Sequence, residues 1–350
     1  MAKQKALAGC AVVFAVLCVL VATCHAQIKC KNERGTTADW WVALKYPDSR
    51  NYAYADTSSS ALKNSTNTFA SSSSTTALSA TLSQLYQGLK TVSYVFYSDQ
   101  PPTKKREIEG DKAHSKGVLA VDDNGSGFWL IHSTPLFPKG PSSSSKFAYM
   151  EDSQVNNGQN FLCVTFNGWS AFQNIGAQLL TVRPDIYDSK LTSKATKSAA
   201  NLKSLVDGQY VKTGLTSIKT ITSAGGTQFR SFAKSGYYPR GTDLWDEFVA
   251  PNLRNSLLVQ TWRNGAGGPM PNNCTAKYKV NNVENMNLLK VEWKATTDHS
   301  KWAVSSSSTW YCGGDVNRMD SQGDRGGGAL CFQNSKLSSS VRSALSSTKC

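Results

Sequence analysis

The chain has 350 residues, of which 40% are hydrophobic and 10% aromatic. This apolar content excludes a wholly disordered chain, and the length excludes a small disulfide scaffold and suggests two domains or one large domain in two parts. A formal net charge of +14 indicates a polyanionic partner. Charge alone does not choose among a nucleic acid, an anionic membrane face and a sulfated glycan.

Residues 1–26 have the pattern of a signal peptide. Lys3 and Lys5 form a basic start, an apolar run extends from Ala11 to Ala22, and Ala26 ends a small-residue cleavage site. The mature chain is predicted to begin at Gln27 with a net charge of +12, because two lysines and no acidic residue are removed. No later stretch approaches the roughly 20 apolar residues of a membrane span, so we expect no membrane partner.

The cysteines and sequons indicate an oxidising compartment. Three of nine cysteines leave with the signal peptide, and an even number in a secreted chain predicts disulfides whose pairing the spacing does not rank. A zinc site is the rival interpretation, but no CxxC pair is present. The remaining cysteines are Cys30, Cys163, Cys274, Cys312, Cys331 and Cys350. Sequons at Asn64, Asn124 and Asn273 agree with a lysosomal or secreted protein.

The first half of the mature chain, 27–190, contains β-branched and aromatic runs typical of strands. They are Asp39–Lys45, Thr91–Tyr97, Gly127–His132 and Asn160–Phe166. Strand alternation is expected to bury only one of Trp40 and Trp41. The Ser/Thr-rich stretch Thr57–Ser83 is predicted to be a surface loop that leads into a short helix over Leu78–Leu89. The basic segment Pro101–Arg106 is predicted to be a solvated loop.

The second half is taken as 191–350, because Asp188–Lys203 is rich in Ser, Lys and Ala and predicts a boundary. This half is expected to alternate strands, Leu257–Trp262 and Leu288–Trp293, with a helical piece over Thr242–Asn252. It ends in a glycine-rich loop, Arg325–Gly328, and a terminal helix over Lys336–Leu345.

Two of the three mature histidines lie in the same tripeptide, His114-Ser115-Lys116 and His299-Ser300-Lys301. In an extended segment residues i and i+2 share a face, so each tripeptide sets an imidazole beside an ammonium group. A lone His-x-Lys is a weak motif. One copy in each half, however, is the pattern of a duplicated half-site that closes on a pseudo-dyad.

This pairing suits phosphoryl transfer without a metal. A neutral imidazole can attack phosphorus, a protonated imidazole can give a proton to the leaving oxygen, and the two lysines can hold the equatorial oxygens as charge develops. Two imidazoles crowded with two ammonium groups should have lowered pKa values, which predicts a bell-shaped rate profile in the acid range.

Several segments of the chain resemble the conserved blocks of the deoxyribonuclease II family. The blocks run in order from about residue 30 to Cys350, nearly the whole mature chain. They are Asp39–Lys45, Tyr97–Pro102, His114–Leu119, Gly127–Ser133, Gln159–Phe166, Phe229–Lys234, Asp298–Trp302, Cys312–Arg318 and Arg325–Cys331.

The resemblance implies an acid endonuclease that cuts DNA to 3′-phosphate ends without a metal or other cofactor. The implied fold class is mixed α+β of the phospholipase D type, with two α/β halves packed about a pseudo-twofold axis and both His-x-Lys pairs in one cleft. It also implies the disulfides Cys30–Cys163, Cys274–Cys350 and Cys312–Cys331. The predicted catalytic residues are therefore His114, Lys116, His299 and Lys301, and the predicted partner is DNA.

The phospholipase D pattern adds one test. Its Asp seven residues after the His is absent here, where Val121 and Ser306 occur, so the group that orients each imidazole stays open. The position eighteen residues after each His is polar, which predicts that His132 and Asn317 donate hydrogen bonds to the scissile phosphate.

Two alternatives stay open beside the nuclease. The chain could be a secreted cationic binding protein or toxin on the same scaffold, acting on DNA or glycan by binding alone, although the intact tripeptides speak against it. The same chemistry could also act on a phospholipid diester. The sequence leaves open which His is the nucleophile and the oligomeric state, a homodimer included.

Overall fold

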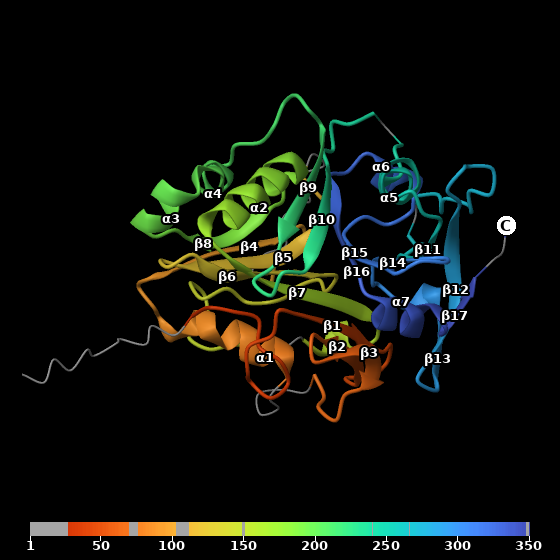
Figure 1. Ribbon diagram of the computed structural model, residues 1–350, viewed down its shortest axis with the longest axis horizontal. Helices are drawn as coiled ribbons and strands as arrows, with labels where there is room; N and C mark the ends of the chain where they lie inside the picture. The colour runs from red at the N-terminus through yellow and green to blue at the C-terminus, as the bar shows by residue number, and fades with distance from the viewer. Residues whose placement is uncertain are drawn as a thin grey trace, which may run out of the picture.

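The computed structural model describes residues 27–69, 76–102, 112–148, 151–239, 241–265, 267–347 and 350 (Figure 1). The predicted signal peptide and the cluster Lys104, Lys105 and Arg106 lie outside these residues. The structure is mixed α+β and contains two large sheets. No described helix is long and apolar enough to cross a membrane.

The first sheet has the strand order β3-β2-β1-β7-β6-β5-β4-β8. Its strands are β1 (Trp40–Lys45), β2 (Tyr52–Asp56), β3 (Ser59–Asn64), β4 (Val92–Ser98), β5 (Lys116–Asp122), β6 (Ser126–His132), β7 (Gln159–Asn167) and β8 (Ile186–Lys190). All of its neighbouring strands are antiparallel. The predicted strands in this half are confirmed, with ends that differ by a residue or two.

The second sheet has the order β13-β12-β11-β14-β15-β16-β10-β9, and β17 pairs with β12. Its strands are β9 (Thr216–Thr222), β10 (Gln228–Lys234), β11 (Leu257–Gln260), β12 (Val280–Leu288), β13 (Val291–Lys294), β14 (Trp302–Ser305), β15 (Trp310–Gly314), β16 (Gly327–Gln333) and β17 (Leu345–Ser347). The β11–β12 pair is parallel.

One five-strand arrangement occurs in both sheets. In the first sheet the antiparallel run β1-β7-β6-β5-β4 contains, in chain order, its first, fifth, fourth, third and second strands. The run β10-β16-β15-β14-β11 of the second sheet has the same order and the same antiparallel neighbours. β5, which begins at Lys116, and β14, which begins after Lys301, are therefore equivalent strands.

The largest core lies between the two sheets. Trp40 of β1 is 4.9 Å from Phe332 of β16, and Phe229 of β10 is 4.7 Å from Phe332, measured between ring centroids. Trp40 and Trp41 are both buried, so the expectation that only one would be buried is wrong. β1 is an interior strand with a core on each face, and Trp41 belongs to the core on the outer face.

Helices cover the outer faces and the flanks. α1 and η1 pack on the outer core of the first sheet, and η3 and α5 pack on that of the second sheet. α2 contacts β7, β9 and β10, and Figure 1 shows it across the first sheet from α1. The helices are α1 (Ala77–Leu82), η1 (Ser83–Gln87), η2 (Asp152–Gln154), α2 (Trp169–Val182), α3 (Ser193–Ser198), α4 (Ala200–Val206), η3 (Leu244–Val249), α5 (Ala250–Leu253), η4 (Ala295–Thr297), α6 (Asp320–Gly323) and α7 (Ser335–Arg342).

Several predicted elements need correction. Leu288–Trp293 is not one strand, because Leu289 and Lys290 have φ values of 53° and 70° and form the turn of the β12–β13 hairpin. Within the predicted Ser/Thr-rich loop, β3 pairs with β2. The terminal helix ends at Arg342, and β17 follows it.

The predicted boundary segment 188–203 is built from regular structure. It contains the end of β8, all of α3 and the first part of α4, and α4 packs on α2 through Leu202 and Leu205. The first sheet nevertheless ends at Lys190 and the second begins at Thr216. The division into halves at 190–191 stays a prediction.

Three disulfides join distant parts of the chain: Cys30–Cys163, Cys274–Cys350 and Cys312–Cys331. This is the pairing that the family resemblance implied. The third bond connects the neighbouring strands β15 and β16 at directly opposed positions.

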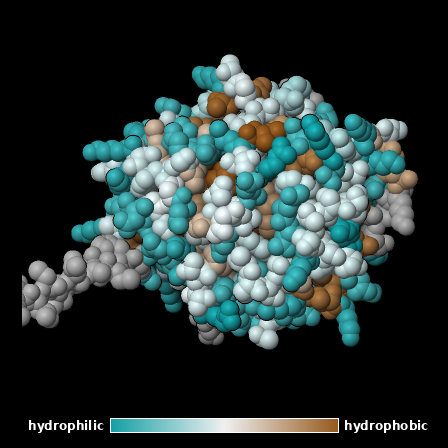
Figure 2. Space-filling model, in the orientation of Figure 1, coloured by the Kyte–Doolittle hydropathy of each residue, from teal (hydrophilic) through white to brown (hydrophobic). Residues whose placement is uncertain are grey.

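The surface shown in Figure 2 is mostly hydrophilic, and its hydrophobic residues gather in small separate patches.

Candidate active site

The two tripeptides lie at the start of equivalent strands, and the histidine of each bonds to a residue beside the other sheet. The backbone N–H of His114, before β5, donates to the carbonyl of Gly326 at 2.9 Å. The backbone N–H of His299, before β14, donates to the carbonyl of Gly158, also at 2.9 Å. Gly158 and Gly326 immediately precede β7 and β16, which are equivalent strands. Each histidine is thus bonded to a glycine that precedes a strand of the other sheet.

Both tripeptides line one cavity of about 260 Å³. Five of the six residues predicted for the site reach it: His114, Lys116, His299, Lys301 and Asn317. The other lining residues are Asp99, Gln100, Ser133, Pro135, Trp262, Gly265, Met319, Ser321, Gln322 and Arg325. The structure therefore brings together two tripeptides that lie 185 positions apart in the sequence.

A buried carboxylate organises the first tripeptide. Asp99 follows the end of β4, and its Oδ1 accepts a hydrogen bond from Lys116 Nζ at 2.5 Å. Its Oδ2 lies 3.0 Å from Arg325 Nη1 and 3.9 Å from His114 Nε2. Burial alone would raise the pKa of Asp99, but the charges of Lys116 and Arg325, and that of His114 when its ring is protonated, outweigh burial and hold the pKa well below its usual range.

The environment of His114 favours its neutral form. Burial lowers the pKa of His114 well below its usual range, Asp99 opposes this effect, and the charges of Lys116, Lys301 and Arg325 add to it. Among the described residues, Nδ1 of His114 has no hydrogen-bond partner. The phospholipase D pattern places a carboxylate downstream of the His, whereas here the carboxylate near the His114 ring comes from a residue fifteen positions upstream. It faces Nε2 at 3.9 Å, beyond hydrogen-bond distance.

The second tripeptide meets an aromatic ring. The indole of Trp262 lies edge-on to the His299 imidazole, with 3.8 Å between ring centroids. Lys301 Nζ donates to the carbonyl of His299 at 3.0 Å, and the backbone N–H of Lys301 donates to Asn160 Oδ1 at 2.7 Å. Burial and the charges of Lys301 and Lys116 lower the pKa of His299 to about 3.

Lys301 titrates near neutrality in this cavity. Burial and the charge of Lys116 lower the pKa of Lys301 to about 7, although Asp99, Asp315 and Asp298 act in the opposite direction. Lys301 therefore gains its positive charge as the pH falls below neutral. An anionic phosphate in the cavity would further favour the protonated forms of the lysine and of both histidines.

Asn317 and His132 differ in their access to the cavity. Asn317 lines it, and its side-chain oxygen has no hydrogen-bond partner among the described residues. His132 ends β6, and its buried ring packs against Phe137 and Phe161 at centroid distances of 5.7 and 6.0 Å. Burial, with the charges of Lys116 and Lys301, lowers the pKa of His132 to about 3. His132 thus lies near both lysines but is not one of the lining residues.

Sequence reasoning assigned none of the ten other lining residues to the site, and three of these, Asp99, Arg325 and Trp262, act on the two histidines by charge or by contact. Asp99 and Arg325 lie inside family-like blocks, but nothing in their spacing connects them with His114. They belong to opposite halves and meet only because β4 and the segment before β16 reach the same edge of the cavity. Among the described residues, no group of three or more His, Cys, Asp or Glu side chains could hold a metal ion.

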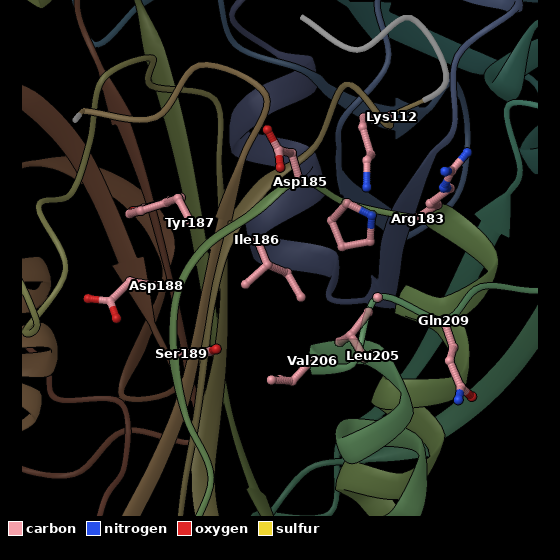
Figure 3. Close-up of a pocket in the computed structure, with 12 residues that line it drawn as sticks. Lys112, Arg183, Asp185, Ile186, Tyr187, Asp188, Ser189, Leu205, Val206 and Gln209 are labelled. Atoms are coloured by element: carbon pink, nitrogen blue, oxygen red, sulfur yellow. The ribbon is translucent and has the colours of Figure 1, made fainter. Parts of the chain in front are cut away.

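Figure 3 shows a second cavity, of about 390 Å³, that is linked to the first through Arg325 and Lys112. The Arg325 guanidinium, which lines the first cavity, donates to the carbonyls of Lys112 and Ala113. Lys112 also lines the second cavity, together with Arg183 and Asp185 at the end shown at the top of Figure 3. Leu205 and Val206 of α4 lie at its opposite end.

The predicted glycosylation sites differ in accessibility. Asn64 and Asn124 are exposed, in the last position of β3 and in the turn between β5 and β6. Asn273 is half-buried, and its side-chain nitrogen donates to Asp246 Oδ2 at 2.6 Å. All three sites stay predictions.

Comparison with known proteins gives a consistent assignment. The family model described as Deoxyribonuclease II matches residues 29–350. The chain is 35% identical to pig (Sus scrofa) deoxyribonuclease-2-alpha, over 87% of this chain and 86% of that protein. It is 34% identical to plancitoxin-1 of Acanthaster planci, over 91% of each chain. It is 32% identical to deoxyribonuclease-2 of Caenorhabditis elegans, over 93% of this chain and 95% of that protein.

Proposed function

Because the chain belongs to the deoxyribonuclease II family and is a hydrolase of that type, we propose that it is an acid endonuclease that cuts DNA to 3′-phosphate ends. The observation that carries this proposal is the single cavity lined by both His-x-Lys pairs. An imidazole pair and an ammonium pair around one space match the needs of phosphodiester hydrolysis.

The reaction proceeds in two displacements at phosphorus. The neutral ring nitrogen of one histidine, His114 or His299, attacks phosphorus, and the bond to the 5′ oxygen breaks as the other histidine, protonated, gives that oxygen its proton. The 3′-phosphate is then bonded to the first histidine. The second histidine, now neutral, takes a proton from water as the water oxygen attacks phosphorus. The phosphorus–nitrogen bond breaks, and the 3′-phosphate product leaves.

Lys116 and Lys301 stabilise the charge that develops on the equatorial oxygens. Both side chains line the cavity, where low solvent access strengthens their attraction for an anion. Asn317 donates a further hydrogen bond to the phosphate, a role that its place on the wall supports. The same role for His132 has less support from the geometry, because its ring lies among phenylalanines.

Acid operation follows from the charge balance of the cavity. The pKa values of both histidines are lowered by burial and by the lysines, so the protonated partner that the first step requires forms only in acid. The same fall in pH also protonates Lys301, whose pKa is lowered to about 7. Metal-free chemistry is part of the proposal, because imidazole and ammonium groups supply the nucleophile, the acid and the charge stabilisation.

The proposal includes a pseudo-twofold relation between the halves, as in the phospholipase D type of fold. The repeated five-strand topology and the reciprocal bonds of His114 and His299 to Gly326 and Gly158 support it. Three disulfides support a lysosomal or secreted location. A cationic binding protein that does not cut DNA is disfavoured, since it needs no such cavity.

A plasmid-nicking assay at about pH 5 tests the proposal. We expect the purified mature chain to convert supercoiled DNA to nicked and linear forms with a chelator present, and to lose this activity toward neutral pH. End-labelling of the products should show 3′-phosphates. Loss of cutting in the chelator, with recovery on adding magnesium, would overturn the mechanism. Binding without cutting would favour the binding-protein alternative.

A further inference from the structure

Two buried lysines end equivalent strands outside the cavity. Lys45 is the last residue of β1 and Lys234 is the last residue of β10, with exposed fractions of 2% and 0%. Lysine is almost never fully buried unless its ammonium group is paired. Among the described residues, neither lysine forms an ion pair within 4.0 Å. Both ammonium groups donate instead to backbone carbonyls.

The carbonyls that they bind hold equivalent places in the two halves. Lys45 Nζ donates to the carbonyl of Val155 at 2.7 Å, and also to those of Tyr46 and Ser49. Lys234 Nζ donates to the carbonyl of Gly323 at 2.6 Å. Val155 is the C-cap of η2, and Gly323 is the last residue of α6. In both halves a lysine therefore binds the end of a short helical turn.

Each helical turn leads directly to the residue that accepts from a tripeptide. Val155 is three residues before Gly158, whose carbonyl accepts from the backbone N–H of His299. Gly323 is three residues before Gly326, whose carbonyl accepts from the backbone N–H of His114. A three-residue link has little slack, so a displacement of the bound carbonyl moves the glycine that holds the histidine.

We propose that Lys45 and Lys234 are a matched pair of positioning residues. Each fixes the position of one tripeptide histidine, which lies beside the other sheet. Lys45 acts through Val155 and Gly158 on His299, and Lys234 acts through Gly323 and Gly326 on His114. Neither lysine touches the substrate. The inference rests on the proposed function, because it assigns the lysines to the placement of the two proposed catalytic histidines.

The surroundings of the lysines keep them charged in acid. Burial lowers the pKa of each ammonium group to about 8. Asp298 and Asp48 partly offset this for Lys45, and Asp324, Asp243 and Glu247 do so for Lys234. At about pH 5 both groups are therefore full donors, and replacing either one leaves carbonyls at the end of a turn without a partner.

The test measures the rate of chemical modification of each histidine separately in the variants Lys45→Met and Lys234→Met. The mature proteins react briefly with diethyl pyrocarbonate, which modifies neutral imidazole, and peptide mass spectrometry gives the rate at His114, His299 and His132. We expect Lys234→Met to change the rate at His114, and Lys45→Met the rate at His299, each several-fold. The other histidine and His132 should keep their rates.

Activity supplies a second measurement. A displacement of about 1 Å can cost about 100-fold in rate, so we expect kcat at about pH 5 to fall about 10-fold to 100-fold in either variant, with KM nearly unchanged. The matched control is Lys190→Met, because Lys190 also ends a strand, β8, and donates to a carbonyl, that of Leu89, away from the cavity. It should keep wild-type kcat and wild-type histidine rates.

The two measurements separate the possible failures. If the wild type does not cut DNA but the histidine rates respond as expected, the proposed function fails and the positioning role survives. If a folded lysine variant changes both histidines equally, or neither, the positioning role is overturned. Should a methionine variant not fold, Lys45→Gln and Lys234→Gln take its place, since glutamine keeps an N–H donor and carries no charge.

Discussion

Asp99 and Trp262 occupy equivalent positions in the two halves but present opposite chemistry to the two histidines. Ser98 of β4 is paired with Lys116, and extending the β11–β14 register by one pair sets Thr261 against Lys301. Asp99 and Trp262 come directly after these residues. One places a carboxylate 3.9 Å from His114, and the other places an indole 3.8 Å from His299. The groups beside the two histidines therefore differ, which makes the proposed pair asymmetric for proton transfer.

The first prediction concerns Asp99→Asn. Asp99 raises the pKa of His114 against the effects of burial and of the lysines, so its removal should lower this pKa further. The limb of the pH–rate profile that His114 controls should move toward lower pH, and kcat at about pH 5 should fall about 10-fold or more. A profile of kcat/KM against pH checks this. An unchanged limb in a folded variant would show that Asp99 does not act on His114.

The second prediction uses Trp262→Ala. Burial is the main cause of the low pKa of His299, so opening this side of the ring to water should raise it. The limb that His299 controls should move toward higher pH, opposite in direction to the change in Asp99→Asn. The same profile measures both variants and shows which histidine controls which limb. Shifts in one direction for both variants would contradict the asymmetry.

The third prediction is a pH dependence of stability. The pKa of Asp99 is held below its usual value of about 3.9 by Lys116, His114 and Arg325, so its stabilising effect is complete above that pH and is lost as the pH falls through the folded-state value. Removing one partner of a buried ion pair costs about 3 kcal/mol or more. Asp99→Asn should therefore unfold at lower denaturant concentration at pH 6.

The control for that measurement is Asp152→Asn, since Asp152 pairs with Arg50 at an exposed position. Surface pairs contribute about 0 to 1 kcal/mol, so this variant should stay near wild type. Equal losses in the two variants would mean that Asp99 contributes no more than a surface charge does.

The fourth prediction concerns the disulfide between β15 and β16. Asn317 lies in the connection that Cys312–Cys331 closes, with a sequence separation of 19 residues. The chain-entropy estimate for a loop of this size is about 3 kcal/mol. The double variant Cys312→Ala/Cys331→Ala should lose about that much free energy of unfolding in urea. It should also lose activity at temperatures where it is still folded, because the loop that places Asn317 is no longer closed. Loss of stability with unchanged activity would contradict a role of this disulfide in placing Asn317.

Much of the central fold could be predicted from the sequence. Runs such as Asp39–Lys45 and Asn160–Phe166 are long, β-branched and aromatic, and they form interior strands buried on both faces. The prediction of one strand over Leu288–Trp293 was wrong because a tight turn lies at Leu289 and Lys290. This turn contains neither of the residues, Gly and Asn, that usually indicate one. A short apolar run gives no indication of such a reversal.

The site could be predicted only as far as its repeated motif reached. Two identical tripeptides in a chain with few histidines marked His114 and His299, and the structure places both at one cavity. Asp99 and Lys234 carry no such mark, because the roles proposed for them depend on contacts with Lys116 and Gly323 that only the folded chain creates. His132 shows the converse, since spacing selected it and tertiary packing set its ring among phenylalanines.

The most direct test of the account compares His114→Ala, His299→Ala and the double variant in single-turnover cleavage of DNA at about pH 5. If both histidines act on one phosphate, each single variant should lose nearly all turnover and still bind DNA, and the double variant should be little worse than either. Substantial activity in His114→Ala beside its loss in His299→Ala, or losses that multiply in the double variant, would show that the two tripeptides do not form one site.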